Sequence, residues 1–306
     1  MFSWKKLGLV FKPNQRLNWM QTHCQLPVIS KINESLHRVY FASRDKHQIS
    51  QIGWVDINIS NPKEIINFSK TPILSKGDYG CFDEHGVFPS SIIDVGEKKY
   101  LYYIGWVRGF ESPMFYASIG LAISEDNGVT FKKYSKSPIL SRSKYDPCLV
   151  TSPNVIKVGN EFKMTYVSGI KWFRDEKDQL KSKYHIKIAS SNDGINWLRE
   201  GKIAVDFKDK HETNIARPSV IYYKNKYHMW FSYVKGESKY RMGYASSVDF
   251  DKWIRDDKKS GLTLSNSGFD SSMTCYPHVF NYNNSFYMLY NGNQFGKDGF
   301  GLAIQE

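Results

Sequence analysis

Four carboxylates stand at matching places in the chain, each six or seven residues ahead of a proline that opens an apolar stretch. The segment KHETNIARPSVIYY is one of these places, and its Glu212 precedes Pro218. Carboxyl groups at the mouth of a strand suit general acid, general base or nucleophile chemistry, in which two of them act on one bond. The candidate catalytic residues are therefore Asp83, Asp146, Glu212 and Asp270.

The prolines belong to an internal repeat that covers most of the chain. Successive prolines are 59 to 65 residues apart, and each opens an apolar strand. A polar turn, a dense strand such as YLYYIGW, and a third strand rich in small residues follow each proline. We assign a weaker fourth strand to PILS, which occurs twice, and to IAVDF. The repeat prolines are Pro27, Pro89, Pro153, Pro218 and Pro277.

This period predicts an all-β fold, a five-bladed β-propeller with four antiparallel strands per blade. Aromatic residues make up 15% of the chain and favour strands over helices. The last repeat supplies only three strands, so we expect the N-terminal strand LGLVFKP to close the last blade. We expect one domain over residues 1–306, with blades at roughly 19–76, 77–141, 142–206, 207–265 and 266–306 plus 5–12.

One face of such a propeller should hold the chemistry. The segments that enter the inner strands carry the acidic residues and lie with long insertions on one face, and functional groups concentrate on loops of a rigid scaffold. The segments SEDNGVTF, SSNDGINW and SSVDFDKW fall on the opposite face. There we expect Asp126, Asp193 and Asp249 to hold turns through their side chains rather than to act on a ligand.

Candidate ligand-binding residues on the first face are basic, aromatic and polar. The arginines could bind an anionic group, and the rings could stack on sugars or simply pack between blades. For Glu212 the alternative to catalysis is a salt bridge with Arg217, and for His278 the alternative is a core histidine. The full set is His23, Gln25, Arg44, His85, Trp106, Arg108, Trp172, His211, Arg217, Tyr276 and His278.

The net charge and composition of the chain limit the kinds of ligand and partner that we expect. The formal net charge of +12 favours anionic ligands, but the basic residues are dispersed, so we expect no nucleic-acid partner. The N-terminal apolar run is too short for a signal peptide, and no stretch approaches the ~20 residues of a membrane span, which predicts a cytoplasmic protein. Four cysteines without CxxC spacing predict reduced thiols, no metal site and no cofactor. They are Cys24, Cys81, Cys148 and Cys275.

With five repeats, an acidic residue before most inner strands and prolines at the strand openings, residues 19–306 resemble five-bladed glycoside hydrolases and phosphorylases of families 43, 32 and 130. The pattern is most similar to small glycosidase-like proteins of bacterial surface-polysaccharide gene clusters. In family 43, a first-blade aspartate is the general base, a third-blade aspartate orients the reaction, and a fourth-blade glutamate is the general acid. The resemblance implies that Asp146 orients and that Glu212 is the acid.

The first repeat departs from the family pattern, because QTHCQLPVI contains no carboxylate. Glycosidic cleavage normally needs one protonated carboxylic acid and one carboxylate, and a glutamine can replace neither. Either Asp83, Asp270 or His23 supplies the base or nucleophile, or the protein does not hydrolyse by this route.

These observations predict a carbohydrate-active enzyme of glycoside hydrolase type that acts on a sugar, a glycan or a sugar nucleotide, with an anionic ligand group as one option. Its pathway would be bacterial surface-polysaccharide metabolism, such as that of O-antigen or capsule. One alternative is a glycosyltransferase or phosphorylase that uses the same channel. The other is a glycan-binding or scaffold propeller without catalysis.

Overall fold

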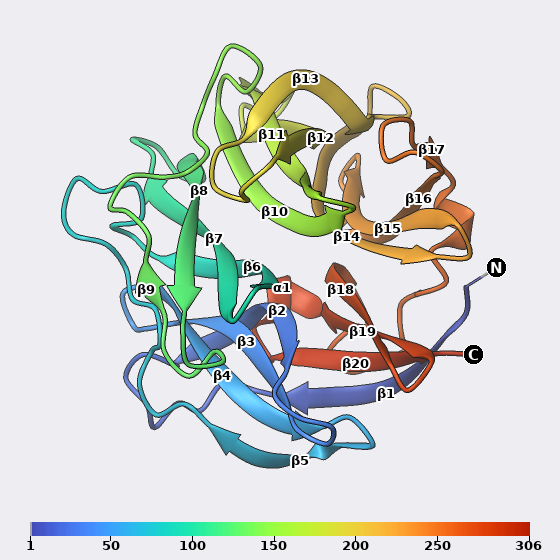
Figure 1. Cartoon of the computed structure of the whole chain (residues 1–306). Helices are drawn as coiled ribbons and strands as arrows, with labels where there is room; N and C mark the ends of the chain where they lie inside the picture. The colour runs from blue at the N-terminus through green and yellow to red at the C-terminus, as the bar shows by residue number, and fades with distance from the viewer. Residues whose placement is uncertain (1) are drawn as a thin grey trace.

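The computed structural model describes residues 2–306, which fold almost entirely as antiparallel β-sheet. In Figure 1 the sheets are arranged around the middle of the molecule, with one strand of each repeat near the centre and one at the rim. The prediction of an all-β, propeller-like fold is confirmed. Within residues 2–306 no helix is long and apolar enough to cross a membrane.

The first two repeats form separate four-stranded sheets in which strand order follows chain order. The first sheet contains β2 (Thr22–Lys31), β3 (His37–Arg44), β4 (Ser50–Asn58) and β5 (Asn61–Phe68). The second contains β6 (Val87–Val95), β7 (Lys98–Arg108), β8 (Phe115–Ser124) and β9 (Lys132–Lys133).

The third and fourth repeats share one eight-stranded sheet, whereas the sequence predicts two separate blades. The long hairpin of β11 and β12 explains the difference, because β12 reaches far enough to make one parallel pair, Tyr184 with Asn214 in β14. The third repeat contains β10 (Leu149–Val158), β11 (Glu161–Arg174), β12 (Leu180–Ser191) and β13 (Leu198–Val205). The fourth contains β14 (Glu212–Tyr223), β15 (Lys226–Lys235), β16 (Arg241–Ser247), β17 (Ile254–Arg255) and the 3-10 helix Asp257–Lys259.

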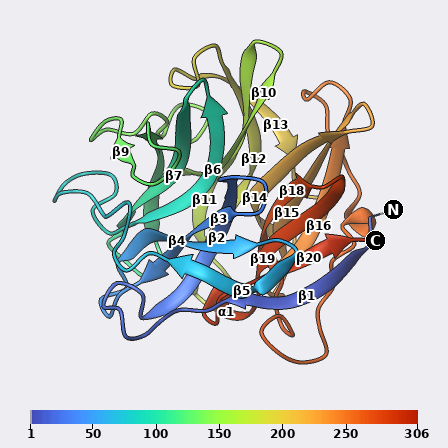
Figure 2. The same ribbon diagram turned by 60° about the horizontal axis from the view of Figure 1, so that its bottom comes forward.

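The last sheet joins the two ends of the chain. It contains β18 (Cys275–Tyr282), β19 (Ser285–Asn291), β20 (Phe300–Gln305) and, as its fourth strand, β1 (Trp4–Phe11), with the short helix α1 (Asn293–Gly296) between β19 and β20. β1 pairs antiparallel with β20, and Figure 2 shows the two termini at the same edge. This is the pairing that the unpartnered segment LGLVFKP predicts.

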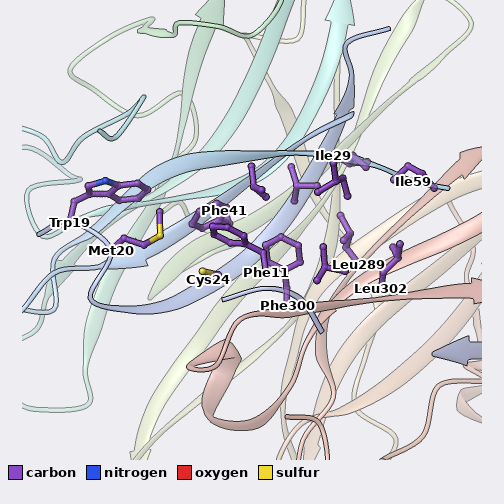
Figure 3. Close-up of a cluster of buried hydrophobic side chains, with 14 residues drawn as sticks. Phe11, Trp19, Met20, Cys24, Ile29, Phe41, Ile59, Leu289, Phe300 and Leu302 are labelled. Atoms are coloured by element: carbon purple, nitrogen blue, oxygen red, sulfur yellow. The ribbon is translucent and has the colours of Figure 1, made fainter. Parts of the chain in front are cut away.

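A cluster of buried side chains lies between the first and last sheets (Figure 3). The ring centroid of Phe11 in β1 lies 5.2 Å from that of Phe41 in β3 and 6.2 Å from that of Phe300 in β20. Burial of these rings stabilises the contact between sheets that come from opposite ends of the chain.

The outermost strands differ from their predicted positions in two repeats. β5 and β9 precede the two PILS segments, and the segments themselves make only isolated bridges, Leu74 with Ile52 and Leu140 with Ile119. The proline that opens each PILS segment has no N–H to donate to a ladder, which limits regular pairing there. In the third repeat IAVDF does belong to the outermost strand, β13, up to Val205.

The inner strands contact one another in turn, β2 with β6, β6 with β10, β10 with β14, β14 with β18 and β18 with β2. Polar residues that follow the repeat prolines link several of these strands. The links are hydrogen bonds from Val155 N–H to Ser91 Oγ (3.0 Å), from Val220 N–H to Asn154 Oδ1 (3.0 Å) and from Val279 N–H to Ser219 Oγ (2.8 Å).

Each inner strand also loses its regular register at the repeat proline. In four of the five repeats the residue just before this proline has a positive φ: Leu26 (53°), Ser152 (49°), Arg217 (55°) and Tyr276 (57°). A non-glycine residue in this region stores strain of about 1–3 kcal/mol, and such strain gathers at functional sites. A β-bulge redirects a side chain, here at the centre of the molecule.

Candidate functional site

A cavity of about 790 Å³ lies on the face where the inner strands begin. Its wall includes four of the five residues that directly precede a repeat proline, Leu26, Phe88, Ser152 and Tyr276. The ends of β3, β7 and β15 and the loop at 109–114 complete it. This volume is in the range of ~300–1,000 Å³ that small-molecule sites occupy, so the predicted face does contain a ligand-sized cavity.

Aromatic rings make up much of the wall. Trp106 is half-buried and donates from Nε1 to Ser50 Oγ (2.8 Å), and Tyr276 stacks on Phe295 with ring centroids 6.3 Å apart. The hydroxyls of Tyr184 and Tyr240 are hydrogen-bonded to each other. Rings with polar edges beside backbone and hydroxyl groups suit the mixed apolar and polar faces of a sugar.

The charged residues in the wall are all basic. Arg44, Arg108 and Lys239 line the cavity, and no aspartate or glutamate does so within residues 2–306. Arg44 donates from Nε to Gln25 Oε1 (3.0 Å), and Arg108 donates to the carbonyl oxygen of His47 (2.7 Å). These three basic side chains give the wall a positive potential. Burial lowers the pKa of Arg44, because it disfavours the charged form of the guanidinium.

The four candidate catalytic carboxylates do not line this cavity. Asp83 is buried and accepts from Lys133 Nζ in β9 (2.6 Å) and from the Tyr103 hydroxyl (3.3 Å). Asp270 is buried in the same way and accepts from Lys6 Nζ in β1 (2.6 Å) and from the hydroxyl of Tyr290 (2.9 Å).

Asp146 is fully buried and accepts from Arg199 in β13 (2.9 Å) and from the Tyr166 hydroxyl (3.1 Å). Glu212 is 2% exposed and forms a bidentate pair with Arg255 in β17, at 2.6 and 3.0 Å. The alternative partner from the sequence, Arg217, does not contact Glu212, because Arg217 donates to Ser90 and Pro27 across the centre.

The four carboxylates therefore share one structural environment. Each lies just before or at the start of an inner strand and pairs with a lysine or arginine on the outermost strand of the same sheet, and we call this pair a clasp. A clasp ties the two edges of a repeat together and neutralises a buried charge. The expectation that these carboxylates converge on one cavity is not met, and their recurrence is accounted for by the clasps.

The first repeat holds its edges together without a clasp. Gln21, at the position of the carboxylates, donates from Nε2 to the carbonyl oxygens of Gln15 and Leu17, both at 2.8 Å. The Trp19 indole donates to the carbonyl oxygen of Lys70 (2.9 Å) beyond β5. In the first repeat, the hydrogen bond from Trp19 thus links the two edges of the sheet, as a clasp does in the other repeats.

Five of the predicted ligand-binding residues line the cavity: Gln25, Arg44, Trp106, Arg108 and Tyr276.

Three further predicted residues lie beside this wall. The imidazole of His23 is near Arg44, and burial, with the charges of Arg44 and Lys297, lowers its pKa to about 4. The ring of His85 lies 5.9 Å from that of Trp106, and the ring of Trp172 lies 5.7 Å from that of Phe115.

The remaining predicted residues are outside the wall. His211 is exposed in a loop, where its carbonyl oxygen accepts from Gly236 N–H (2.8 Å). His278 stacks on Phe280 with ring centroids 6.3 Å apart, and burial, followed by the charge of Arg217, lowers its pKa to about 3. Arg217 is 1% exposed at the centre of the molecule.

The sequence interpretation missed several residues of the wall. Tyr184, Asn214 and Lys239 enter it from β12, β14 and the loop before β16. Asn214 stands two residues after Glu212, and the sequence interpretation selected the carboxylate at this place and not the amide. The signal that could have found part of the wall is the position before each repeat proline, because it is structurally equivalent in every repeat.

The aspartates of the opposite face hold turns, as the sequence predicts. Asp193 accepts from the N–H groups of Ile195 and Asn196, both at 2.8 Å, and these hydrogen bonds lower its pKa. Asp126 and Asp249 accept backbone N–H groups of their own turns in the same way.

The structure offers no assembled metal ligands. In the described part of the chain, residues 2–306, no three His, Cys, Asp or Glu side chains gather as a metal site would require. All four cysteines are free thiols, Cys24 and Cys275 buried and Cys81 and Cys148 half-buried.

The fold is propeller-like and contains a ligand-sized cavity, and sequence comparison places the chain in a family. The chain is 34% identical, over 304 residues and 99% of both chains, to the uncharacterized protein MT1551 of Mycobacterium tuberculosis strain CDC 1551 / Oshkosh. It has the same identity and coverage with the uncharacterized protein Rv1502 of strain H37Rv. The chain belongs to the family of these two proteins. No family model matches it.

Solved structures with the same fold are glycoside hydrolases. A glycosyl hydrolase from Bacteroides ovatus has a TM-score of 0.75 and 15% identity, with 99% of this chain and 93% of that chain covered. A thermostable family-43 glycoside hydrolase has a TM-score of 0.68 and 16% identity, with 97% and 91% covered. The GH32 beta-fructofuranosidase of Bombyx mori has a TM-score of 0.61 and 16% identity, with 96% and 62% covered. The resemblance to glycosidase-like proteins is thus confirmed for the fold.

Proposed function

We propose that this chain is a carbohydrate-active protein, a five-bladed propeller that binds a saccharide in the cavity of about 790 Å³. The observation that carries the proposal is the wall itself, where rings such as Trp106 and Tyr276 alternate with hydrogen-bonding groups such as Gln25 and Asn214. Three solved structures of similar fold, two named as glycoside hydrolases and one as a GH32 beta-fructofuranosidase, support the same class of ligand.

The blade boundaries are part of this proposal. The strands of the first four repeats fall within residues 19–76, 77–141, 142–206 and 207–265, and those of the last fall within 266–306 plus 5–12, except for the first residue of β1. The ring of contacts among the five inner strands supports closure of a single five-bladed domain over residues 1–306.

The lining favours transfer over hydrolysis. Hydrolysis by the usual route needs two carboxyl groups about 5–9.5 Å apart around the glycosidic bond, and the cavity wall holds none within residues 2–306. A sugar nucleotide needs no acid at its leaving group, because the departing diphosphate is already anionic and is stabilised by cations. Arg44, Arg108 and Lys239 are placed to provide that stabilisation. We therefore propose glycosyl transfer from an anionic donor, either a sugar nucleotide or the sugar phosphate that a phosphorylase uses in its synthetic direction, because the group that leaves either donor is a phosphate anion.

Glycoside hydrolysis stays the second candidate, since solved structures of this fold are named as hydrolases. It would require Glu212 as the acid, Asp146 as the orienting group and Asp83 or Asp270 as the base or nucleophile, each released from its clasp. A binding role without catalysis is the third candidate. Like glycosyl transfer, it agrees better than hydrolysis with a wall that holds no aspartate or glutamate within residues 2–306.

For the pathway we propose bacterial surface-polysaccharide metabolism in the cytoplasm, on the strength of the sequence resemblance to glycosidase-like proteins of surface-polysaccharide gene clusters.

The purified chain should be incubated with a panel of sugar nucleotides, with and without acceptor glycans. A transferase consumes donor in the presence of the right acceptor, whereas a hydrolase releases free sugar without one. Variants Glu212→Gln and Asp146→Asn separate the candidates further. If either variant stays folded and binds ligand yet loses turnover, hydrolysis at the clasps replaces the present proposal.

A further inference from the structure

Two arginines near the centre of the molecule have no carboxylate partner. Arg44 and Arg217 form no salt bridge with any residue in the described range 2–306, although Arg217 is 1% exposed and Arg44 is half-buried. Every clasp arginine, by contrast, faces a carboxylate. An unpaired buried charge is strongly unfavourable, so such a cation is normally retained only where an anion comes from elsewhere.

The hydrogen bonds of Arg217 leave one edge of its guanidinium underused. Nη1 donates to the carbonyl oxygen and to Oγ of Ser90. Nη2 makes only a long contact with the carbonyl oxygen of Pro27 (3.4 Å), and the buried Nε has no hydrogen-bond partner. The Nε and Nη2 edge of a guanidinium is a fork that matches the two oxygens of a carboxylate or phosphate.

Tyr276 and Arg217 occupy the same position in their repeats, directly before the repeat proline. Burial raises the pKa of Tyr276 well above its usual range, and the positive charges of Arg44 and Arg217 oppose that rise. Tyr276 lines the cavity together with Arg44, and Arg217 follows the lining residue Ala216. The backbone at both Tyr276 and Arg217 is held at positive φ, 57° and 55°.

We propose that Arg44, Tyr276 and Arg217 form a receptor for the anionic group of the ligand, a carboxylate or a phosphate, at the central end of the cavity. This inference rests on the proposed saccharide site and narrows its ligand to an acidic sugar or a phosphorylated sugar. The anion accepts two hydrogen bonds from the free edge of Arg217, and Arg44 and the Tyr276 hydroxyl close around it. Burial is the main reason that the pKa values of His23 and His278 are lowered, and the charges of Arg44 at His23 and of Arg217 at His278 add to it.

The test is calorimetric titration of the full chain with four kinds of probe: inorganic phosphate, UDP-glucose, glucuronate, and the neutral sugars glucose, galactose and mannose. The variants are Arg217→Lys, which keeps the charge but loses the fork, and Arg44→Gln. The matched control is Arg16→Gln, because Arg16 is exposed in a loop outside the cavity wall. Circular dichroism and thermal melting show that each variant is folded.

We expect at least one anionic probe to bind the wild type and to bind Arg217→Lys and Arg44→Gln at least about tenfold more weakly, with Arg16→Gln unchanged. A preference for glucuronate indicates a carboxylate ligand, and a preference for phosphate or UDP-glucose indicates a phosphorylated one. If Arg217→Lys does not fold, Arg44→Gln alone decides. Equal anion binding by the wild type and the variants, or no anion binding at all, overturns the receptor.

The neutral sugars keep the two proposals apart. If they bind and the anions do not, the receptor fails while the saccharide site stands. If phosphate binds through Arg44 and Arg217 but no sugar-bearing probe binds, the receptor stands and the saccharide site fails.

Discussion

Replacing Glu212 with a neutral residue should lower the free energy of unfolding. We do not expect it to remove a catalytic acid. Glu212 is 2% exposed and accepts two hydrogen bonds from Arg255, at 2.6 and 3.0 Å, and one from the Lys208 N–H at 2.9 Å. In Glu212→Gln the shape is kept, but the buried guanidinium loses the charge that it faces. Arg255 keeps its second partner, Asp257, at 3.0 Å.

The expected magnitude follows from this geometry. Breaking a buried ion pair from one side costs about 3–5 kcal/mol, and the remaining Asp257 places the loss near the lower figure, about 3 kcal/mol. With 306 residues and about 2.1 cal/mol/K per residue, the unfolding entropy is about 0.6 kcal/mol/K, so Tm should fall by about 5 °C.

Denaturant unfolding of Glu212→Gln, Arg255→Gln and the double variant gives a double-mutant cycle. We expect a coupling free energy of about 2 kcal/mol or more, because the two side chains act as a buried unit. The control is Glu34→Gln, which breaks the exposed Lys31–Glu34 pair (2.6 Å) and should leave stability unchanged. The reasoning is refuted if Glu212→Gln keeps full stability but abolishes turnover of a saccharide.

Three further predictions concern the fold. Phe11→Ala should destabilise by about 3–5 kcal/mol in denaturant, because Phe11 packs between the first and last sheets; a loss below about 1 kcal/mol would contradict that packing. Asp193→Ala should lower Tm slightly and leave ligand binding unchanged, since its turn follows the end of β12 far from the cavity, and weakened binding would speak against this. The pKa of His278 is depressed to about 3 in the folded state, so the unfolded state takes up a proton first as pH falls below about 6.5 and stability is lost. His278→Gln should remove roughly 1–2 kcal/mol of the fall in unfolding free energy between pH 7 and 5, and identical slopes for both proteins would refute this.

The fold could be predicted from the sequence because it repeats. The prolines at Pro27, Pro89, Pro153, Pro218 and Pro277 mark the inner strands, and all five lie within strands of the structure. The turn aspartates were predictable as well, because an Asx turn depends only on residues within a few positions of Asp126 or Asp193.

The role of the carboxylates could not be predicted in the same way. The basic partner of each clasp lies far along the chain, 43 residues from Glu212, 50 from Asp83, 53 from Asp146 and 264 from Asp270. It also lies on the outermost strand, which is the weakest in sequence and the one whose position was partly mispredicted. Without the partner in view, a carboxylate that recurs before each inner strand is indistinguishable from a catalytic one.

Residues that support the fold differ from residues that bind a ligand in whether the same residue type recurs among the repeats. A contact that most repeats share, such as the clasp in four of the five, places the same residue type at the same position each time, so recurrence favours a role in the fold. A binding site at the centre is asymmetric, because one ligand must contact several repeats in different ways.

The position before the repeat proline has this asymmetry, with leucine, phenylalanine, serine, arginine and tyrosine in the five repeats. Four of these residues line the cavity, and the fifth, Arg217, is a buried cation without a carboxylate partner in residues 2–306. In KHETNIARPSVIYY we therefore propose that the ligand-binding residue is Arg217, whose type differs among the repeats, and not Glu212, whose acidic type four repeats share.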